Sequence, residues 1–523
     1  MGKRKRGSAE AERKGDSALV QVNGSNLPHT TTPIGISDSE IPVTLQIVTG
    51  SYEKVLHGLT AEISASSSEK PTTETENAVK FADTFLFNAH SSAIRCLAIS
   101  PPSATSESGE PPKVVLASGS TDERINLYQL STTPPPARHQ KGTASLPSLA
   151  GSIVTENPKN KELGSLLHHA SSISALYFPT RSKLLSSSED NTIAIARTRD
   201  WTVLSTIKAP TPKVHGRPSG DTAPPGGSPA GVNDFAVHPS MKLMISVGRG
   251  ERCMRLWNLV TGKKAGVLSF TREMLHGVGE GKWGSGEGRK VAWNRQGNEF
   301  VVGFERGAVT FGMNSKPRSR LLPAPLTKLH QLCYVDPGPN EGEQGEGGPS
   351  RDVVAVSTED GRVIFYSTSN DSSSKGDGES AAIHDCTEIG QLGGKAVSVS
   401  GRIKDFKILR PSASEPSSGG ALYVVTASSD GAIRVWSVDS KDVFGTSPVS
   451  NGDTKPSKHL KSSQDQDASE PQAPQPRQIG KLLGTYETGN RITCLAAFTM
   501  TGGSVAEPAT EAGSEDDESD DSE

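Results

Sequence analysis

The sequence predicts an all-β fold, a seven-bladed β-propeller closed by a clasp of N- and C-terminal strands. Three observations support this prediction. A short pattern recurs seven times, in which an acidic residue lies six positions before an aromatic or apolar residue. A second, apolar pattern typical of inner strands precedes these units. The first and last strand segments of the chain are each too short to form a complete unit.

The recurring unit consists of a strand of small and β-branched residues, a tight turn that holds the acid, and a second strand with alternating apolar residues. The acids are Glu53, Asp122, Asp190, Glu251, Glu305, Asp360 and Asp430. The residues six positions later are Leu59, Tyr128, Ala196, Trp257, Phe311, Tyr366 and Trp436. An acid in a tight turn can accept hydrogen bonds from the backbone of that turn. An even offset keeps the later residue on one face of its strand. We therefore interpret the seven acids as structural residues of blade turns.

Inner strands are indicated by four-residue segments that are apolar at their first and fourth positions. We identify five such segments, at 94–97, 173–176, 232–235, 403–406 and 492–495. His90 and His169 each lie four residues before one of them. Because both histidines hold the same place in the repeat, we interpret them as structural, hydrogen-bonded to a Ser and the Asp of their blade. The alternative is a role in acid–base catalysis.

The two ends of the repeat region are expected to share one blade. Segment 44–63 supplies the last two strands of a blade, and segment 479–498 supplies the first two. Joining them leaves no open sheet edge at the closure, and open edges promote aggregation.

Long insertions separate the predicted blades. Neighbouring acids lie 54 to 70 residues apart, whereas a plain repeat of this kind needs ~40–45. The excess falls in Ser-, Pro- and Gly-rich stretches, which we expect to be flexible surface loops because they bury little apolar surface. These stretches are 64–80, 101–112, 131–160, 210–230, 337–350, 368–380, 411–420 and 439–478. We predict a disordered basic tail at 1–39, the propeller at 40–500 and a disordered acidic tail at 501–523.

Composition limits the other classes of protein. The chain of 523 residues has 54 Gly and 35 Pro, and only 33% hydrophobic residues, which suits one domain with many turns better than several compact ones. No apolar run approaches the length of a membrane helix, and no signal peptide opens the chain. The five cysteines form no CxxC pair and no metal-binding cluster. We expect a soluble intracellular protein without a metal.

The net charge of −4 conceals a basic head and an acidic tail. Lys3, Arg4, Lys5 and Arg6 are a candidate nuclear import signal, the alternative being a solvated charge run. The last residues, 511–523, contain eight acids and no base. Within them, Ser514 precedes three acids and is a candidate phosphorylation site; the alternative is a merely solubilising tail.

No catalytic constellation is apparent in the sequence. Residues 277–283, GVGEGKW, superficially match a phosphate-binding loop, but Trp283 stands where that motif needs Ser or Thr. No nucleophile–base or metal set appears. We therefore expect no enzymatic activity, no cofactor and no small-molecule substrate.

The repeats resemble those of WD40-repeat proteins, in which a Gly-His and a Trp-Asp pair mark each unit. The pairs are degraded here to Ala89-His90, His168-His169, Trp257-Asn258 and Trp436-Ser437. Segments 47–59, 87–100, 231–265 and 489–498 are similar to the Mak-eleven family of WD-repeat proteins, whose animal members are p21-activated-kinase-interacting proteins. This similarity covers most of 44–498 outside the insertions.

The resemblance implies a nucleolar, non-enzymatic scaffold for maturation of the large (60S) ribosomal subunit, bound to pre-ribosomal proteins and possibly to rRNA. It also implies, for animal members, negative regulation of p21-activated kinase, so a signalling adaptor is the second hypothesis. Other WD-repeat roles, in chromatin or ubiquitin ligases, remain alternatives. The acidic end departs from the Lys-rich tail common in the family. Candidate basic contacts at or near turns are Arg95, Arg124, Arg249, Arg252 and Arg491.

Overall fold

A computed structural model describes residues 43–64, 78–103, 111–135, 155–211, 231–281, 284–338, 352–368, 383–399, 401–411, 420–445 and 477–501. The predictions for Lys3–Arg6, Ser514, the two tails and most of the insertions fall on residues outside these ranges. The division of the chain into a basic tail, a propeller and an acidic tail therefore stays a prediction.

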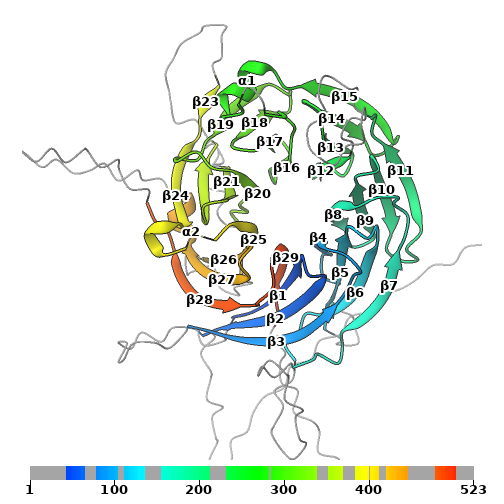
Figure 1. Cartoon of the computed structure of the whole chain (residues 1–523), viewed down its shortest axis with the longest axis vertical. Helices are drawn as coiled ribbons and strands as arrows, with labels where there is room; N and C mark the ends of the chain where they lie inside the picture. Colours follow the sequence, from blue (N-terminus) through cyan, green and yellow to red (C-terminus); the bar gives the residue numbers. More distant parts are fainter. Residues whose placement is uncertain are drawn as a thin grey trace, which may run out of the picture. The chain divides into compact units, whose positions relative to one another are not determined.

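Residues 43–501 form seven antiparallel sheets arranged as a ring around a central axis (Figure 1). The seven-bladed propeller is thereby confirmed. We number the blades from 1 to 7 along the chain and give the strands of each from the axis outward.

Blade 1 contains β29 (Ile492–Thr499), β1 (Val43–Ser51), β2 (Val55–Ile63) and β3 (Val79–Asn88). Blade 2 contains β4 (Ile94–Ile99), β5 (Lys113–Ser120), β6 (Ile125–Ser131) and β7 (Lys161–Leu166). Blade 3 contains β8 (Ile173–Thr180), β9 (Lys183–Ser188), β10 (Thr192–Arg197) and β11 (Val203–Lys208). Blade 4 contains β12 (Val232–Val237), β13 (Leu243–Gly248), β14 (Cys253–Asn258) and β15 (Lys263–Ser269).

Blade 5 contains β16 (Lys290–Trp293), β17 (Glu299–Gly303), β18 (Ala308–Gly312), β19 (Pro317–Leu321) and the short β23 (His384–Asp385). Blade 6 contains β20 (Leu329–Tyr334), β21 (Val353–Thr358), β22 (Arg362–Ser367) and β24 (Thr387–Gly393). Blade 7 contains β25 (Ile403–Leu409), β26 (Ala421–Ser428), β27 (Ala432–Asp439) and β28 (Lys481–Glu487). Short helices lie at α1 (Arg272–Gly277), η2 (Lys395–Val397) and α2 (Ser440–Phe444).

The middle strands of each blade are buried on both faces because a neighbouring blade covers each side. Every residue of β21 and β22 is buried, and both strands are rich in β-branched residues that pack well on a pleated surface. The hydrophobic core is accordingly divided into clusters between adjacent blades. One such cluster joins Val48 and Leu56 of blade 1 to Ile94, Leu116 and Tyr128 of blade 2.

Blade 1 closes the ring, but its strands are not divided as predicted. The N-terminal part supplies three strands, and the C-terminal part supplies only β29, which pairs with β1 from Leu45↔Thr499 to Ser51↔Ile492. The prediction of two strands from each end is wrong. The strand that follows each turn acid is the third of its sheet, and a fourth, outer strand comes after it. Segment 481–487 is therefore the outer strand of blade 7 rather than part of the closing blade.

The outer strands are the elements that sequence patterns identify least well. In β7 every residue is exposed or half-buried, and in β11 Ile207 is the single buried residue. Such strands bury one face or less and show no apolar alternation. Their existence follows from the completed sheets rather than from any local signal.

Two glycines allow neighbouring blades to approach closely. A Cβ on Gly50 would lie 2.6 Å from Cγ2 of Ile94, and a Cβ on Gly119 would lie 2.7 Å from Cγ2 of Ile173. Both glycines lie in the second strand of a blade, opposite the first apolar residue of the next inner strand. The contact between blades 1 and 2 thus repeats between blades 2 and 3.

Two segments reach back to the preceding blade and extend its outer edge. Strand β23 arises from the connection between the third and fourth strands of blade 6, and it runs parallel to β19 of blade 5. Arg320 and Asp385 form an ion pair across this junction. Residues just before β28 of blade 7 lie beside β24 of blade 6, where the N–H of Gln391 donates to the carbonyl of Arg477 at 2.9 Å.

All seven turns between second and third strands lie at one end of the ring, which we call the turn face. In blade 2 the N–H of Thr121 in this turn donates to the carbonyl of Ala93, just before the inner strand, at 3.1 Å. Equivalent bonds occur around the ring, for example from Tyr52 to Arg491 at 2.8 Å and from Ser429 to Arg402 at 2.9 Å. The turn face therefore combines these turns with the segments that lead into the inner strands.

Candidate functional site at the turn face

The structure places each of the seven predicted acids in the turn between the second and third strands of its blade. The acids are Glu53, Asp122, Asp190, Glu251, Glu305, Asp360 and Asp430. They consequently surround the axis on the turn face. Their partners, however, divide them into two groups.

The first group consists of Asp122 in blade 2 and Asp190 in blade 3, which bind histidines. Nδ1 of His90 lies 3.1 Å from the carboxylate of Asp122, and its Nε2 lies 2.8 Å from Oγ of Ser118. The arrangement repeats in blade 3, with Nδ1 of His169 3.1 Å from Asp190 and Nε2 2.8 Å from Ser186. Each histidine thus links the segment before its inner strand to the middle of its blade.

Burial disfavours the protonated form of the histidine in blade 2. Burial lowers the pKa of His90, although the nearby carboxylate of Asp122 opposes this shift. Burial alone would raise the pKa of Asp122, but hydrogen bonds from the N–H groups of Ser91 and Arg124, and the proximity of His90, outweigh it and lower the pKa. The carboxylate accepts from Ser91 N–H at 2.9 Å and from Arg124 N–H at 3.1 Å. The pair is therefore a hydrogen-bonded support for the turn.

The other five acids have no histidine and bind cations or backbone instead. Glu305 pairs with Lys328 at 2.9 Å and with Arg289 at 3.2 Å, while Asp360 pairs with Arg362 at 2.8 Å. Glu251 pairs with Arg255 on its own hairpin. Glu53 accepts from the N–H of Arg491 at 2.9 Å, and Asp430 accepts from the N–H of Ala432 at 3.2 Å.

The inner strands carry β-bulges at matching positions near the turn face. In six of the seven, the pairing skips one or two residues directly after the first apolar residue in the strand. The skipped residues are Arg95, Ser174, Asn233, His330 with Gln331, Lys404 and Thr493. A bulge redirects the side chain of its extra residue. All of these residues line one cavity.

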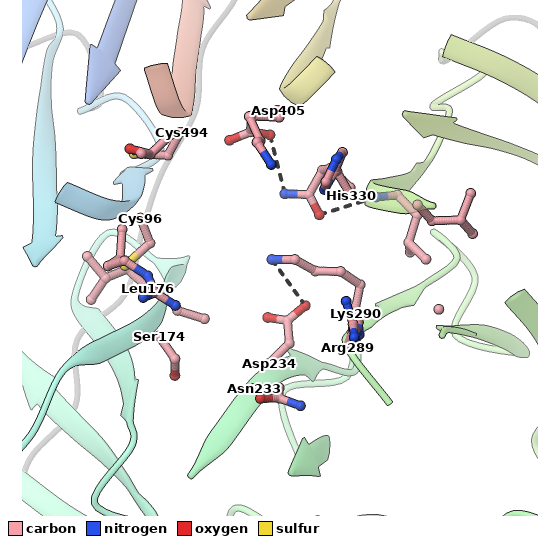
Figure 2. A pocket seen from close by; sticks show the side chains of 18 of the residues that line it. Cys96, Ser174, Leu176, Asn233, Asp234, Arg289, Lys290, His330, Asp405 and Cys494 are labelled. Atoms are coloured by element: carbon pink, nitrogen blue, oxygen red, sulfur yellow. Dashed lines mark hydrogen bonds and ion pairs between the residues drawn. The ribbon is translucent and has the colours of Figure 1, made fainter. Parts of the chain in front are cut away.

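This central cavity has a volume of about 550 Å³ and is lined by the inner strands of all seven blades (Figure 2). Its charged lining comprises six Lys or Arg side chains and four carboxylates. Figure 2 shows Lys290 and Asp234 facing each other, with 3.9 Å between Nζ and Oδ2. Burial raises the pKa of Asp234, and the positive charge of Lys290 opposes this rise. Removal of either side chain would leave the other charge buried without its partner. Asp405 accepts from the N–H of Leu495 at 2.9 Å.

Several cations gather at the turn-face mouth of the cavity, and among them Lys404 has no ion pair in the described residues. Burial, together with the nearby cations Lys404, Arg402, Arg289 and Lys328, lowers the pKa of His330 to about 4. Burial likewise lowers the pKa of Lys404, with Arg402 the next cause. Like charges at short range disfavour each other's charged forms. The mouth is therefore electrostatically suited to an anionic ligand.

All five candidate basic contacts lie on the turn face, but their surroundings differ. Arg249 pairs with Glu189 at 2.8 Å, and Arg252 donates to the carbonyls of Ser285 and Gly284 at 2.9 and 3.0 Å. Arg124 is exposed in its turn. Arg95 and Arg491 line a pocket at the cavity mouth.

Sequence patterns did not identify Lys404, Arg402, Arg289, Lys328 or His330 as members of this site. Lys404 and His330 occupy bulges, which leave no mark in a single sequence. The inner-strand motif does not fit β16, which begins with Lys290, and the five segments identified by it do not include β20, although Leu329 and Leu332 of β20 fit it. The sequence signal that could have revealed the site is the residue at the second position of each apolar four-residue segment, compared across all the blades.

The sheets, turn acids and histidine pairs together define a WD40-repeat β-propeller. A family model described as "WD domain, G-beta repeat" matches residues 82–129 and 160–195. These ranges contain His90 with Asp122 and His169 with Asp190, and they end within the third strands of blades 2 and 3. The other blades keep the fold while their acids have other partners.

Among known proteins, the chain is similar to protein MAK11 of Saccharomyces cerevisiae, with 27% identity over 76% of this chain and 78% of that protein. It is also similar to a p21-activated protein kinase-interacting protein 1-like of Danio rerio, with 28% identity over 49% of this chain and 48% of that protein. Shk1 kinase-binding protein 15 of Schizosaccharomyces pombe is 24% identical over 43% of this chain and 47% of its own length. The resemblance to the Mak-eleven and p21-activated-kinase-interacting family is confirmed. The chain spans about half the length of the last two relatives.

Two further observations concern the described ranges alone. No helix in them combines the length and apolar character needed to cross a bilayer. No group of three or more His, Cys, Asp or Glu side chains in them is arranged to hold a metal ion.

The histidine–acid pair of blade 2 should contribute measurably to stability. We expect Asp122→Asn to lower the free energy of unfolding by about 1–3 kcal/mol, because buried donors lose their acceptor. Asp200→Asn is the matched control, since the Arg197–Asp200 ion pair is largely exposed and should change stability little. Urea denaturation followed by circular dichroism measures both. Equal effects of the two substitutions would contradict the structural role of the pair.

The half-buried histidines at the turn face should make stability depend on pH. Burial lowers the pKa of His168 to about 4, with His169 the next cause, and the pKa of His330 is also about 4. Between the unfolded value of about 6.5 and these values, the unfolded chain binds protons that the folded chain does not. The free energy of unfolding therefore decreases by about 1 kcal/mol for each of these histidines as the pH falls from 7 to 5.

This pH dependence can be measured as a difference between variants. The double variant His168→Gln/His330→Gln should lose less stability than the unsubstituted chain between pH 7 and pH 5. His276→Gln, at an exposed position, is the control and should retain the full dependence. Because burial raises the pKa of Glu299, which acts in the opposite direction, only the difference between proteins is diagnostic. Identical curves for all three would contradict the interpretation.

Proposed function

We propose that the protein is a non-enzymatic WD-repeat scaffold that acts in assembly of the large (60S) ribosomal subunit. The observation that carries this proposal is the similarity to MAK11 over 76% of the chain, together with the resemblance to the Mak-eleven family. The closed propeller and its cationic cavity mouth are compatible with holding protein or RNA segments of a pre-ribosomal particle.

The proposal includes a place in the cell. A 60S assembly factor works in the nucleolus, and Lys3–Arg6 would serve as its nuclear import signal. The net charge of the chain is −4, but the cations of the turn face lie apart from the acidic residues 511–523 in the sequence. Contacts made by such cations weaken with salt when the partner is a nucleic acid.

Gradient sedimentation tests this proposal. The tagged protein should sediment with large-subunit precursors, move to light fractions as the salt is raised, and accumulate in nucleoli under the microscope. Depletion should lower the amount of 60S subunits relative to 40S, and re-expression of the same chain should restore it. The proposal fails if the protein stays in light fractions and depletion leaves 60S levels unchanged.

A second candidate is an adaptor that negatively regulates a p21-activated kinase. The names of the Danio rerio and Schizosaccharomyces pombe relatives favour it, since both describe binding to a kinase. A pull-down with fragments of a kinase regulatory region separates this function from the first. Binding at micromolar concentration is expected for an adaptor, and its absence at that concentration argues against this candidate.

A further inference from the structure

A second pocket, of about 540 Å³, opens on the turn face where blades 1, 2 and 7 meet. Its lining is Tyr52, Lys54, Ser92, Ala93, Arg95, Thr121, Lys404, Arg491, Ile492 and Thr493. The charged members of this set are all cations, and no carboxylate belongs to it. We call it the cationic pocket. It shares Arg95, Lys404 and Thr493 with the central cavity, so the two spaces adjoin.

The cations of this pocket lack the acidic partners found elsewhere on the turn face. In the ranges that the structure describes, neither Lys54, Arg95 nor Lys404 makes an ion pair or a side-chain hydrogen bond. The guanidinium of Arg491 lies 5.4 Å from the ring centre of Tyr52 rather than against a carboxylate. The nearest acid in sequence, Glu53, accepts from the backbone of Arg491.

Other cations on the same face are neutralised by contrast. Arg249 has Glu189, Arg402 has Glu359 at 3.1 Å, and Lys328 and Arg289 share Glu305. Among the described residues, Arg124 and Arg306 are further exposed cations of this face without an ion pair, but the cationic pocket gathers four cations without an ion pair in one concavity. A second observation agrees with this: Nε2 of His330, on the adjoining cavity wall, is buried and has no hydrogen-bond partner among the described residues.

The shape and charge of the surroundings favour a short acidic peptide over a nucleic acid. The pocket is concave, and the adjoining cavity places the carboxylates of Asp234 and Asp405 beneath it, with the amides of Asn233 and Gln331. A nucleic acid carries a phosphate at every step and would meet these carboxylates. A peptide can place a few anionic side chains on the cations and direct neutral residues into the cavity.

The acidic tail of this chain is poorly placed to be that peptide. Strand β29 begins at the turn face with Ile492 and ends at Thr499 on the opposite side of the blade. The N–H of Thr501 then donates to the carbonyl of Thr132, just beyond the end of β6, at 2.8 Å. The chain therefore leaves the propeller on the face away from the pocket, which favours a ligand from another protein.

We propose that the cationic pocket binds a short acidic segment of a partner protein, in which Glu, Asp or phosphoserine side chains contact Arg95, Lys404, Lys54 and Arg491. This inference rests on the scaffold part of the proposed function and not on its assignment to ribosome assembly. The binding experiment below uses purified components, so it can fail while the protein still sediments with large-subunit precursors.

Fluorescence anisotropy with the full chain tests the proposal directly. The probes are labelled nine-residue peptides rich in Glu and Ser, with and without phosphoserine, a matched Gln peptide, and a nine-nucleotide oligouridylate. We expect the acidic peptide to bind, phosphoserine to tighten binding several-fold, and the Gln peptide not to bind. Arg95→Glu/Lys404→Glu should weaken acidic-peptide binding at least tenfold.

Matched variants separate a specific site from general charge and from misfolding. Lys161→Glu/Lys263→Glu makes the same change in net charge at exposed positions on β7 and β15, and should alter affinity less than twofold. The single variant Arg95→Gln changes an exposed side chain and should still weaken binding if the double variant fails to fold. Lys404→Arg should retain binding.

Several outcomes would overturn the proposal. They are no binding of either acidic peptide, equal losses in the pocket and control variants, or oligouridylate that binds more tightly than the peptides and displaces them. A chain truncated after residue 501 should bind as the full chain does. If only the truncated chain binds, the acidic tail fills the pocket and a partner segment is not its ligand.

Discussion

Closure of the ring between β29 and β1 is the interaction on which the rest of the propeller depends. Each blade buries its faces against two neighbours, so a missing inner strand in blade 1 would uncover blades 2 and 7 as well. The partners are far apart in sequence, since Gly50 and Thr493 are separated by 443 positions. The length-dependent part of closing such a loop costs about 5 kcal/mol. The paired strands and the buried residues of blade 1, such as Ile47 and Leu495, offset this cost.

The same closure creates the site. Seven inner strands converge on one axis, and the bulges after their first apolar residues bring one side chain per bulged blade to the mouth of a common cavity, with two from blade 6. Around this mouth, carboxylates near the turns pair with several cations, as Glu305 does with Lys328 and Arg289 and Glu189 does with Arg249. The cations of the cationic pocket, which come from blades 1, 2 and 7, have no such partner, because Asp122 is occupied by His90, and Glu53 and Asp430 accept from backbone N–H groups. The asymmetry of charge thus comes from which partner each acid has.

Much of this architecture could be predicted from the sequence, because the acid and the residue six positions later keep their spacing in every blade. Leu59 and Ala196 hold the place of an aromatic residue and are buried as Trp257 and Trp436 are. The outer strands could not be predicted, since exposed segments such as β7 lack an apolar pattern. Nor could the membership of the cationic pocket be predicted. Lys404 and Arg95 are 309 positions apart in sequence, and only the closure of the ring brings them together.

The segments that reach back from blades 6 and 7 make the rim of the ring unequal. An outer strand normally offers unpaired N–H and C=O groups to which another chain can add a strand. On β19 that place is occupied by β23, and on β24 it is occupied around Gln391 by residues next to Gln478. Among the described residues, β7, β11, β15 and β28 have no strand beside them, and β3 has only a single backbone bond, from Thr155 N–H to the carbonyl of Asp83 at 2.7 Å, and exposes Leu86 and Phe87. Strand addition by another molecule is therefore open on blades 2, 3, 4 and 7 and along most of blade 1, and it is obstructed on blades 5 and 6, so the rim is less symmetric than the ring of sheets.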